Sequence, residues 1–402
     1  MLYAKLISFR HGTWLLGGSA VALALTACGG GGGGGAAEGT LKLAMTDSPG
    51  CGYDHVYVTV SKVRIHASSS ASDSDSGWRE MVVSPQQRID LLGLTNGALQ
   101  ELGSLPLPAG RYEQVRLVLA GNPLDNALVL SSNPGTEIAL TTPSGQQSGY
   151  KLQAHFDVTG NQVADMVLDF DACKSIVRAG NSGNYNLKPV VAVTQRLTTQ
   201  IEGYVDPAIA SSVVVSTRDT ANQLRATVPD SNGKFVIAYL PESPNYTVVV
   251  SGTGRTTAAV TGVPVSLATG RTILNASTAP IAPAVSPTAQ VAGTVSNASS
   301  ALLTDAHVLA QQALSTAQVL DVAWTGVDPV TAQYTLTLPL NAPVKASYAG
   351  SGGPLSFSAD SVNPALYSVY GSATGYTTQS TAPAVTLGAA NTVTTQNLVL
   401  AP

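Results

Sequence analysis

The sequence predicts an all-β protein: three β-sandwich-type domains in tandem, after a signal peptide and a glycine-rich tether. Three observations lead to this fold class. Ala, Val, Thr, Ser and Gly dominate the chain, a composition that suits strands and turns more than helices. Apolar and polar residues alternate over many short segments, as they do in half-buried strands. Residues 199–402 also contain a diverged internal repeat of such segments.

Residues 1–27 have the organisation of a secretion signal. Lys5 and Arg10 form a basic region, and the apolar stretch over 13–25 is shorter than the roughly 20 residues that a membrane-spanning helix needs. Leu25-Thr-Ala-Cys28 then resembles the lipobox of bacterial lipoproteins, in which small residues admit the peptidase and the thiol accepts the lipid. The alternative is an ordinary signal peptide with a chance cysteine at position 28.

The lipoprotein resemblance implies that Cys28 is diacylated, with palmitate-type chains, and that the membrane is a partner of the chain. Two acyl chains give stable anchoring. Residues 28–38 would be the lipidated cysteine and its tether, because the unbroken run Gly29–Gly35 has no side chains to bury. No Asp follows Cys28, which in Gram-negative lipoproteins favours the outer membrane; the face of that membrane is left open.

Composition limits the remaining possibilities. Without residues 1–27 the chain keeps about 375 residues, enough for two or three domains. Removal of the two basic residues of the signal changes the formal charge of −4 to about −6. Charged residues are 11% of the chain and form no basic run of five, which argues against a nucleic-acid partner. No second long apolar segment is present, so the lipid would be the membrane attachment.

Two cysteines, Cys51 and Cys173, remain after Cys28. An even pair in an oxidising compartment indicates a disulfide. It would close a loop of more than 100 residues, which the loop-entropy treatment values at roughly 4–5 kcal/mol. The alternative is two free thiols or metal ligands, although neither has a His or Cys at zinc-finger spacing.

The first domain is expected over 39–196. Asp47 falls in a segment typical of a turn, 68–77 is a polar loop of Ser and Asp, and Asn96 is expected to cap a short helical turn that ends at Gly103. Alternation predicts strands at 40–46, 53–65, 114–119, 137–141, 150–156, 163–170 and 185–193.

Several phrases in this domain resemble one known family. They occur in the order Leu43-Ala-Met-Thr-Asp-Ser-Pro49, Val56-Tyr-Val-Thr-Val60, Asp90-Leu-Leu-Gly-Leu-Thr95, Leu107-Pro-Ala-Gly-Arg-Tyr112, Leu168-Asp-Phe-Asp171 with Lys174-Ser175, and Leu187-Lys-Pro-Val190. Residues 40–196 thereby resemble the domain-of-unknown-function family 4382, which is common at the N-terminus of bacterial lipoproteins. The family has no established activity, so the resemblance bears on location and domain limits.

The repeat in the second half predicts a domain over 199–280, a proline-rich linker over 281–287 and a diverged second copy over 288–402. Ile201-Glu-Gly-Tyr-Val205 matches Val291-Ala-Gly-Thr-Val295, and both copies continue to a Leu-Pro pair and a tyrosine strand. The pattern resembles the carboxypeptidase regulatory-like (transthyretin-like) β-sandwich. The second copy carries an insertion around 342–361. Residues 302–322 are rich in helix formers, whereas the repeat alignment favours strand.

The search for reaction chemistry gives few candidates, so no enzyme and no cofactor are expected. Ser231-Asn-Gly-Lys234 fits a Ser-x-x-Lys pattern, but Asn-Gly between strands is typical of a turn. Asp169 and Asp171 would share a strand face and could bind Ca²⁺ or act as acid and base. The alternative is that Phe170 enters the core while both carboxylates face water or cap the turn before Cys173.

Tyr370 and Tyr376, each beside a glycine, are candidates for stacking on sugar rings; the alternative is that they fill the core. The sequence therefore predicts a non-enzymatic, lipid-anchored cell-envelope protein whose β-sandwiches act as binding, adhesion or spacer modules, with a glycan or protein as ligand. One alternative is a carbohydrate-binding lipoprotein for glycan capture. Another is a metal-dependent hydrolase.

Overall fold

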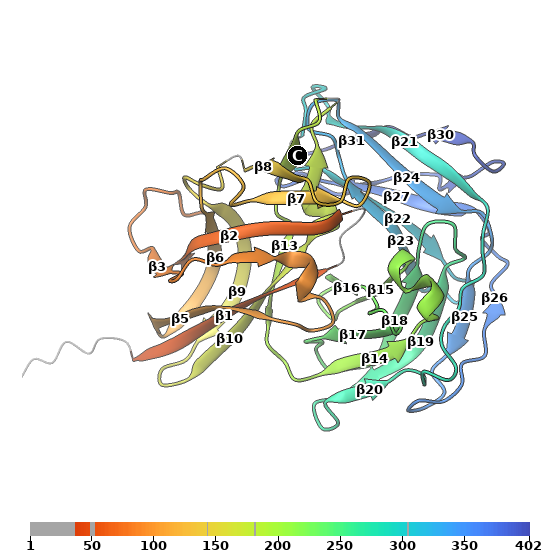
Figure 1. Cartoon of the computed structure of the whole chain (residues 1–402), viewed down its shortest axis with the longest axis horizontal. Coiled ribbons are helices and arrows are strands. Elements are labelled where there is room, and N and C mark those ends of the chain that lie inside the picture. Colours follow the sequence, from red (N-terminus) through yellow and green to blue (C-terminus); the bar gives the residue numbers. More distant parts are fainter. Residues whose placement is uncertain (1–36, 49–52, 143, 181, 304) are drawn as a thin grey trace, which may run out of the picture. The chain divides into compact units, whose positions relative to one another are not determined.

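A computed structural model describes residues 37–48, 53–142, 144–180, 182–303 and 305–402 (Figure 1). Strands account for 53% of the chain and helix for 4%, in several separate sheets, which confirms the predicted all-β class with tandem sandwiches. Among the described residues, no helix is both long enough and apolar enough to cross a membrane. The strands fall into three groups along the sequence, and each group has its own hydrophobic cluster.

The first group of strands is coloured red to yellow in Figure 1 and forms two sheets. One sheet has the order β13-β10-β1-β5, and the other has the order β11-β12-β8-β7-β2-β6-β9, with β3 and β4 also paired to β2. Their bounds are β1 (Glu38–Ser48), β2 (Tyr53–His66), β3 (Arg79–Val82), β4 (Arg88–Asp90), β5 (Gln100–Pro108), β6 (Gly110–Leu119), β7 (Ala127–Leu130), β8 (Glu137–Thr141), β9 (Tyr150–Val158), β10 (Val163–Asp171), β11 (Ile176–Arg178), β12 (Tyr185–Leu187) and β13 (Val191–Gln195), with a 3-10 helix η1 (Leu91–Leu94) and a helical turn α1 (Ala172–Ser175).

The two sheets of this group share one core. Leu43 of β1, Phe170 of β10, Val58 of β2 and Phe156 of β9 belong to the same buried cluster. Side chains of a regular strand alternate strictly between its two faces. On β2 the buried positions are even-numbered up to Val60 and odd-numbered from Val63 on, apart from the buried Thr59. The register of β2 against β6 shifts between Val60 and Lys62, so one extra residue returns the following apolar side chains to the core.

Strand β1 lies between β10 and β5, parallel to β10 and antiparallel to β5. Parallel strands bring their carboxyl ends to the same edge of a sheet. The register places Asp47 of β1 opposite Phe170 of β10, so that it lies between the neighbours Asp169 and Asp171. This pairing, across more than 100 residues of sequence, assembles the carboxylate cluster described below.

The expected helical turn over 96–103 is wrong. Asn96 and Gly97 both have positive φ, at 58° and 79°, and form a turn, while Gln100–Pro108 is strand β5. Asparagine and glycine tolerate the left-handed region better than other residues, so the local sequence favours a turn here.

The second and third groups, green and blue in Figure 1, repeat one topology. The second group is β14 (Gln200–Tyr204), η2 (Pro207–Ser212), β15 (Val214–Arg218), β16 (Leu224–Thr227), β17 (Lys234–Ala238), β18 (Ser243–Ser251), β19 (Ala258–Val265) and β20 (Arg271–Ile273). The C-terminal strands are β21 (Thr288–Asn297), β22 (His307–Ala313), β23 (Val319–Gly326), β24 (Gln333–Pro339), β25 (Val344–Ser347), β26 (Ser358–Ala359), β27 (Leu366–Ser372), β28 (Gln379–Ser380), β29 (Val385–Thr386), β30 (Val393–Thr395) and β31 (Leu398–Leu400).

Corresponding strands make corresponding pairs. β14 is antiparallel to β17 and parallel to β20, just as β21 is antiparallel to β24 and parallel to β30. β15 pairs with β16 and β18 as β22 pairs with β23 and β27. The matched glycines Gly203 and Gly293 lie on the equivalent strands β14 and β21, and neither has room for a Cβ atom. The topology thus agrees with the internal repeat. The resemblance of the repeat to the carboxypeptidase regulatory-like β-sandwich stays a prediction.

A tyrosine contact is also repeated. The Tyr246 hydroxyl donates a hydrogen bond to the Pro241 carbonyl at 2.8 Å, and the Tyr367 hydroxyl donates to the Pro339 carbonyl at 2.6 Å. Both prolines belong to the Leu-Pro pairs that the repeat alignment matches. In each copy this contact fixes the corner that precedes the tyrosine strand.

The insertion around 342–361 joins the sheet of the second group. Strand β25 pairs parallel with β19, and β26 extends the sheet beyond β25. The linker over 281–287 also lies against this group, because Ile281 bridges to Val205 and Val285 bridges to Arg255. The insertion and the linker therefore tie the C-terminal residues to the second group, whereas the exact domain limits stay a prediction.

The described residues of 302–322, all but 304, contribute strands and no helix, as the repeat alignment favours. On β22 buried and half-buried positions alternate, and the strand is hydrogen-bonded on both sides, to β23 and β27. The helix propensity of Ala, Leu and Gln is a few tenths of a kcal/mol per residue, less than the packing that this strand gains in the sheet.

Candidate functional site

The residues expected to carry the lipid and the disulfide are not placed by the structure. Cys28 and Cys51 lie outside the described residues, and so does the side chain of Cys173, whose backbone is part of α1. Lipidation at Cys28 and the disulfide between Cys51 and Cys173 therefore stay predictions.

Asp169 and Asp171 are both buried, at 7% and 8% exposed, so the expectation that they face water is wrong. Each has a cationic partner. Asp169 lies 3.2 Å from the Arg225 guanidinium, and Asp171 lies 2.8 Å from the Lys174 ammonium while its other oxygen accepts the Lys174 backbone N–H. Asp171 thus caps α1, as the alternative interpretation held, and Phe170 between them enters the core.

Asp47 completes this cluster and is not a turn residue. Its side chain is buried at the end of β1, and among the described residues neither carboxylate oxygen has a well-formed hydrogen bond. Burial raises the pKa of Asp47 well above its ordinary value, and the negative charges of Asp171 and Asp169 raise it further, while the backbone N–H of Ala172 opposes them. The protonated form is therefore favoured in the folded chain.

Beside Asp47, Asp169 and Arg225 lies a small cavity of about 20 Å³, which is room for a single water. Across the described residues, no group of three or more His, Cys, Asp or Glu side chains is arranged to hold a metal ion. The pairing of Asp169 with Arg225 and of Asp171 with Lys174 favours a structural role for these carboxylates.

Asn96 lies at the other wall of this space. Its amide donates to the Val228 carbonyl at 3.0 Å, and its oxygen accepts the Val236 backbone N–H at 2.9 Å and the Thr227 hydroxyl at 3.2 Å. The Tyr239 hydroxyl donates to the neighbouring Gly97 carbonyl at 2.6 Å. The turn at Asn96 and Gly97, which was expected to begin a helical turn, thus binds strands of the second group.

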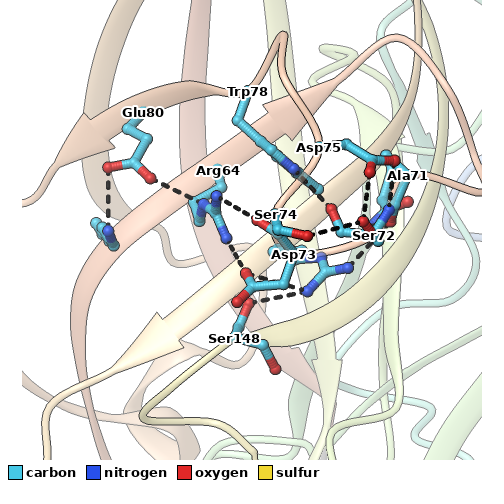
Figure 2. A network of polar contacts seen from close by, with 12 residues as sticks. Arg64, Ala71, Ser72, Asp73, Ser74, Asp75, Trp78, Glu80 and Ser148 are labelled. Carbon is cyan, nitrogen blue, oxygen red and sulfur yellow. Dashed lines mark hydrogen bonds and ion pairs between the residues drawn. The ribbon is translucent and has the colours of Figure 1, made fainter.

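A second cluster surrounds the polar loop over 68–77, and Figure 2 shows its contacts. Arg64 of β2 and Arg116 of β6 are direct cross-strand partners, an arrangement that is unfavourable for like charges. Asp73 of the loop is ion-paired with both guanidinium groups, and Glu80 lies 2.8 Å from Arg64. The anionic loop therefore compensates the paired cations.

Trp78 closes this cluster from the loop side. The guanidinium carbons of Arg64 and Arg116 lie 4.6 and 4.9 Å from its ring centroid, within the range of cation–π attraction. The indole N–H donates to the Ser72 carbonyl at 2.9 Å, and the ring of His66 lies 5.0 Å away. The sequence gives no signal of this cluster, because the facing of the two arginines depends on the register of β2 against β6.

The two tyrosines proposed for sugar stacking lie in different surroundings. Tyr370 is half-buried and lines a cavity of about 610 Å³ together with Arg218, Gln311 and Ser372. The Tyr376 hydroxyl accepts a hydrogen bond from the Asn297 amide at 3.1 Å, and its ring packs against the C-terminal core. Tyr376 does not line the cavity of Tyr370.

Ser315, Lys345 and Asp360 form a compact triad that the sequence did not reveal. The Lys345 ammonium donates to the Ser315 hydroxyl at 2.6 Å and to Asp360 at 2.7 Å, and Ser315 also donates to Asp360. Burial alone would raise the pKa of Asp360, but the hydrogen bonds from Lys345 and Ser315 lower it to about 2. The triad is therefore an ion pair with a shared hydroxyl that anchors the insertion.

The Ser231-Asn-Gly-Lys234 motif is a turn, as its sequence predicts. The Asp230 carboxylate accepts the backbone N–H groups of Asn232 and Lys234, and Gly233 has φ of 79°. The ammonium of Lys234 lies 3.2 Å from Glu202, which leaves it in an ion pair away from the Ser231 turn.

Comparison with known proteins supports one part of the sequence analysis. Residues 38–189 match the sequence model of the family described as Domain of unknown function (DUF4382), which confirms the expected resemblance of the first domain. The match covers under half of the chain, and the description assigns no activity. A search among curated proteins found no match.

Solved structures give only remote likenesses. The Bacillus anthracis TIE protein is 11% identical with a TM-score of 0.19, covering 91% of this chain and 51% of its own, so this chain spans about half its length. A streptococcal ancillary pilin is 11% identical with a TM-score of 0.16, covering 89% and 99%. The Corynebacterium diphtheriae major pilin SpaA is 10% identical with a TM-score of 0.19, covering 90% and 99%. At such TM-scores no role is transferred to this chain.

Proposed function

We propose that this chain is a non-enzymatic, lipid-anchored protein of the bacterial cell envelope whose β-sandwiches act as binding, adhesion or spacer modules. The order of features along the chain carries the proposal: the lipobox-like Leu25-Thr-Ala-Cys28, then Gly29–Gly35, then strand β1 from Glu38. Ten residues lead from Cys28 to Glu38. Fully extended they reach at most about 35 Å, so the sandwiches would stay near the membrane that holds the lipid.

The contacts within the described residues suit such a module. Several of the polar side chains that come together form ion pairs, such as Asp171 with Lys174 and Asp360 with Lys345. Further pairs join strand groups: Asp169 with Arg225, and Asp321 with Arg218 at 2.8 Å. Contacts of this kind suit a stalk or adhesion protein, because they hold neighbouring sandwiches in one fixed relative position.

The anchor is tested by labelling the chain with radioactive palmitate in a Gram-negative host, beside Cys28→Ala and, as the matched control, Cys51→Ala. Label is expected in the wild type and in the Cys51 variant, and it is expected to disappear from the Cys28 variant. Mass spectrometry of the N-terminal peptide should show a diacylglyceryl cysteine. A wild-type chain that is cleaved at another residue and carries no label would reject the proposal.

The envelope location is tested on the same strains. Density-gradient separation of the membranes should place the wild type with the outer membrane. Protease treatment of intact cells then reports which face carries the sandwiches. Recovery of the wild type with the inner membrane would contradict the outer-membrane assignment, while leaving the lipid anchor standing.

A second candidate function, glycan capture, rests on Tyr370. Its half-buried ring lines a cavity that also offers Arg218, Gln311 and Ser372 as polar groups, which is the combination that sugar sites use. A thermal-shift screen against oligosaccharides should raise the melting temperature with one sugar class. Tyr370→Ala should abolish that shift, and Tyr376→Ala, outside the cavity, should keep it. Loss of the shift in both variants, or in neither, would reject Tyr370 as the stacking residue.

A further inference from the structure

A cavity lined in part by the first group has a volume of about 880 Å³, in the range of small-molecule sites. Strand β9 and the segment 186–193 form one wall. The C-terminal residues Asp305, His307 and Val330 contribute to the other. Its apolar lining includes Leu152, Leu187, Pro189, Val190 and Val193.

Lys188 lines this cavity within the phrase Leu187-Lys-Pro-Val190, for which the function proposed above has no use. Its backbone N–H donates to the Ser175 carbonyl at 2.7 Å, which fixes the start of the side chain. The ammonium nitrogen is shielded from solvent and makes no hydrogen bond to any residue that the structure describes. A buried ammonium without an acceptor is costly, so this group has an unmet need for an anion.

The nearest carboxylates do not meet that need. Asp305 accepts the backbone N–H of Thr374 at 2.9 Å, and Asp328 accepts the N–H of Gly180 at 2.8 Å and that of Val330 at 2.8 Å. Burial lowers the pKa of Lys188 to about 8, and the charges of Asp305 and Asp328 offset only part of that effect. The carboxylates thus act on the ammonium from a distance and do not pair with it.

The charges of the lining are also one-sided. Arg116, Lys151 and Lys188 face a single acidic residue, Asp305, although the whole chain has a net charge of −4. The Arg116 guanidinium is occupied by the carbonyls of Ala71 and Ser148. Lys188 is therefore the lining cation that is both buried and without an acceptor.

His307 adds a second polar group to this cavity. One ring nitrogen, Nε2, lies 2.7 Å from the Ser372 hydroxyl. Burial lowers the pKa of His307, and the charge of Lys174 lowers it further. His307 and Lys188 give the lining polar groups for one anionic head group, while its valine and proline side chains suit an apolar body.

We propose that this cavity binds a small organic anion with an apolar body, such as a medium-chain carboxylate or phosphate monoester, with the Lys188 ammonium as its counter-ion. The ligand head would supply the acceptor that the protein does not. The proposal does not depend on the lipid anchor, and either can fail without the other.

The test is titration calorimetry on the mature chain from Cys28, with Cys28→Ser so that no lipid or detergent is present; this keeps the whole compact unit Ala36–Pro402. Decanoate, decyl phosphate and the uncharged decanol are the probes. At least one anion is expected to bind tenfold or more tightly than decanol, and the better anion identifies the head group. Equal affinity for decanol, or no binding of any probe at millimolar concentration, would overturn the proposal.

Lys188→Met should weaken the preferred anion at least tenfold and leave decanol unchanged. Lys42→Met, at an exposed position on β1 outside the cavity, is the matched control and should bind as the wild type does. Val330→Trp provides a second test, because Val330 is 58% exposed and lines the cavity, so a bulky ring there should obstruct entry without disturbing a core. Unchanged anion binding by both Lys188→Met and Val330→Trp would remove the ligand from this cavity.

Discussion

Asp47→Asn is expected to stabilise the protein at neutral pH, although it replaces a buried residue within the first domain. Among the described residues, neither carboxylate oxygen of Asp47 has a well-formed hydrogen bond, and two other carboxylates, Asp169 and Asp171, lie nearby. Its pKa is raised in the folded chain. Each unit of that elevation costs about 1.4 kcal/mol of folding free energy at a pH above both pKa values.

The sign of the pH dependence follows from the direction of that shift. Below the unfolded-state pKa of about 4, Asp47 is protonated in both states and the variant should match the wild type. As pH rises toward the folded-state pKa, the unfolded wild-type chain loses its proton first, so wild-type stability falls. Asparagine does not titrate, so the advantage of the variant should grow with pH and then level off, by about 1.4 kcal/mol for each unit by which the folded-state pKa exceeds the unfolded-state one.

The assay is thermal unfolding of both proteins at several pH values from 4 to 8.5, followed by near-ultraviolet circular dichroism. A gain of 1 kcal/mol corresponds to roughly 2–4 °C for a domain of this size. Asp54→Asn, at an exposed position on β2, is the matched control and should shift the melting temperature little at any pH. A variant that is less stable than the wild type by the same amount at every pH would refute the reasoning, since it would mean that Asp47 is ionised and paired.

Three further predictions concern the other contacts. Gly293→Ala should lower the melting temperature by several degrees, because its Cβ would lie 1.9 Å from the Gln396 carbonyl oxygen, whereas Gly93→Ala, with nothing within 4 Å, should change it little. Asp360→Asn should lower the free energy of unfolding, measured with urea at pH 7, by about 1–2 kcal/mol. Because the pKa of Asp360 is lowered, this loss should shrink as the pH falls from about 4 toward 2. A loss that does not change with pH would contradict the ion pair. Asn96→Ala should cost about 2–3 kcal/mol by leaving its hydrogen-bond partners unpaired, and an unchanged urea midpoint would show that the turn does not bind the second group.

The parts of the fold that could be predicted are those that depend on local pattern. Strand β8 begins and ends where alternation places it, and the segment expected as one strand over 185–193 is two, β12 and β13, because Pro189 lies between them and has no N–H to donate. The matched tyrosines and Leu-Pro pairs predicted the repeat, since one local arrangement is built twice from the same residue types.

The parts that could not be predicted depend on which strands become neighbours. Nothing near Asp47 in the sequence indicates that β1 will run parallel to β10, and without that pairing Asp47 is indistinguishable from a turn residue. The facing of Arg64 and Arg116 likewise depends on a register that includes a one-residue bulge, and a slip of one residue would turn the two side chains to opposite faces. Lys188 can be recognised in the sequence as a motif residue. Only the fold shows that its ammonium is shielded from solvent and has no acceptor among the described residues.

Two ion pairs of this chain lie where strand groups meet. Asp169 with Arg225 joins the first group to the second, and Asp321 with Arg218 joins the second group to the third. A buried ion pair adds little net stability compared with apolar packing, but breaking one leaves an uncompensated charge at a cost of about 3–5 kcal/mol. Neighbouring sheets could pack in several arrangements that bury similar apolar area. An ion pair favours the one arrangement in which its two charges meet. A protein that must present a surface at a defined distance from a membrane needs that selectivity, which is why these pairs fit the proposed role.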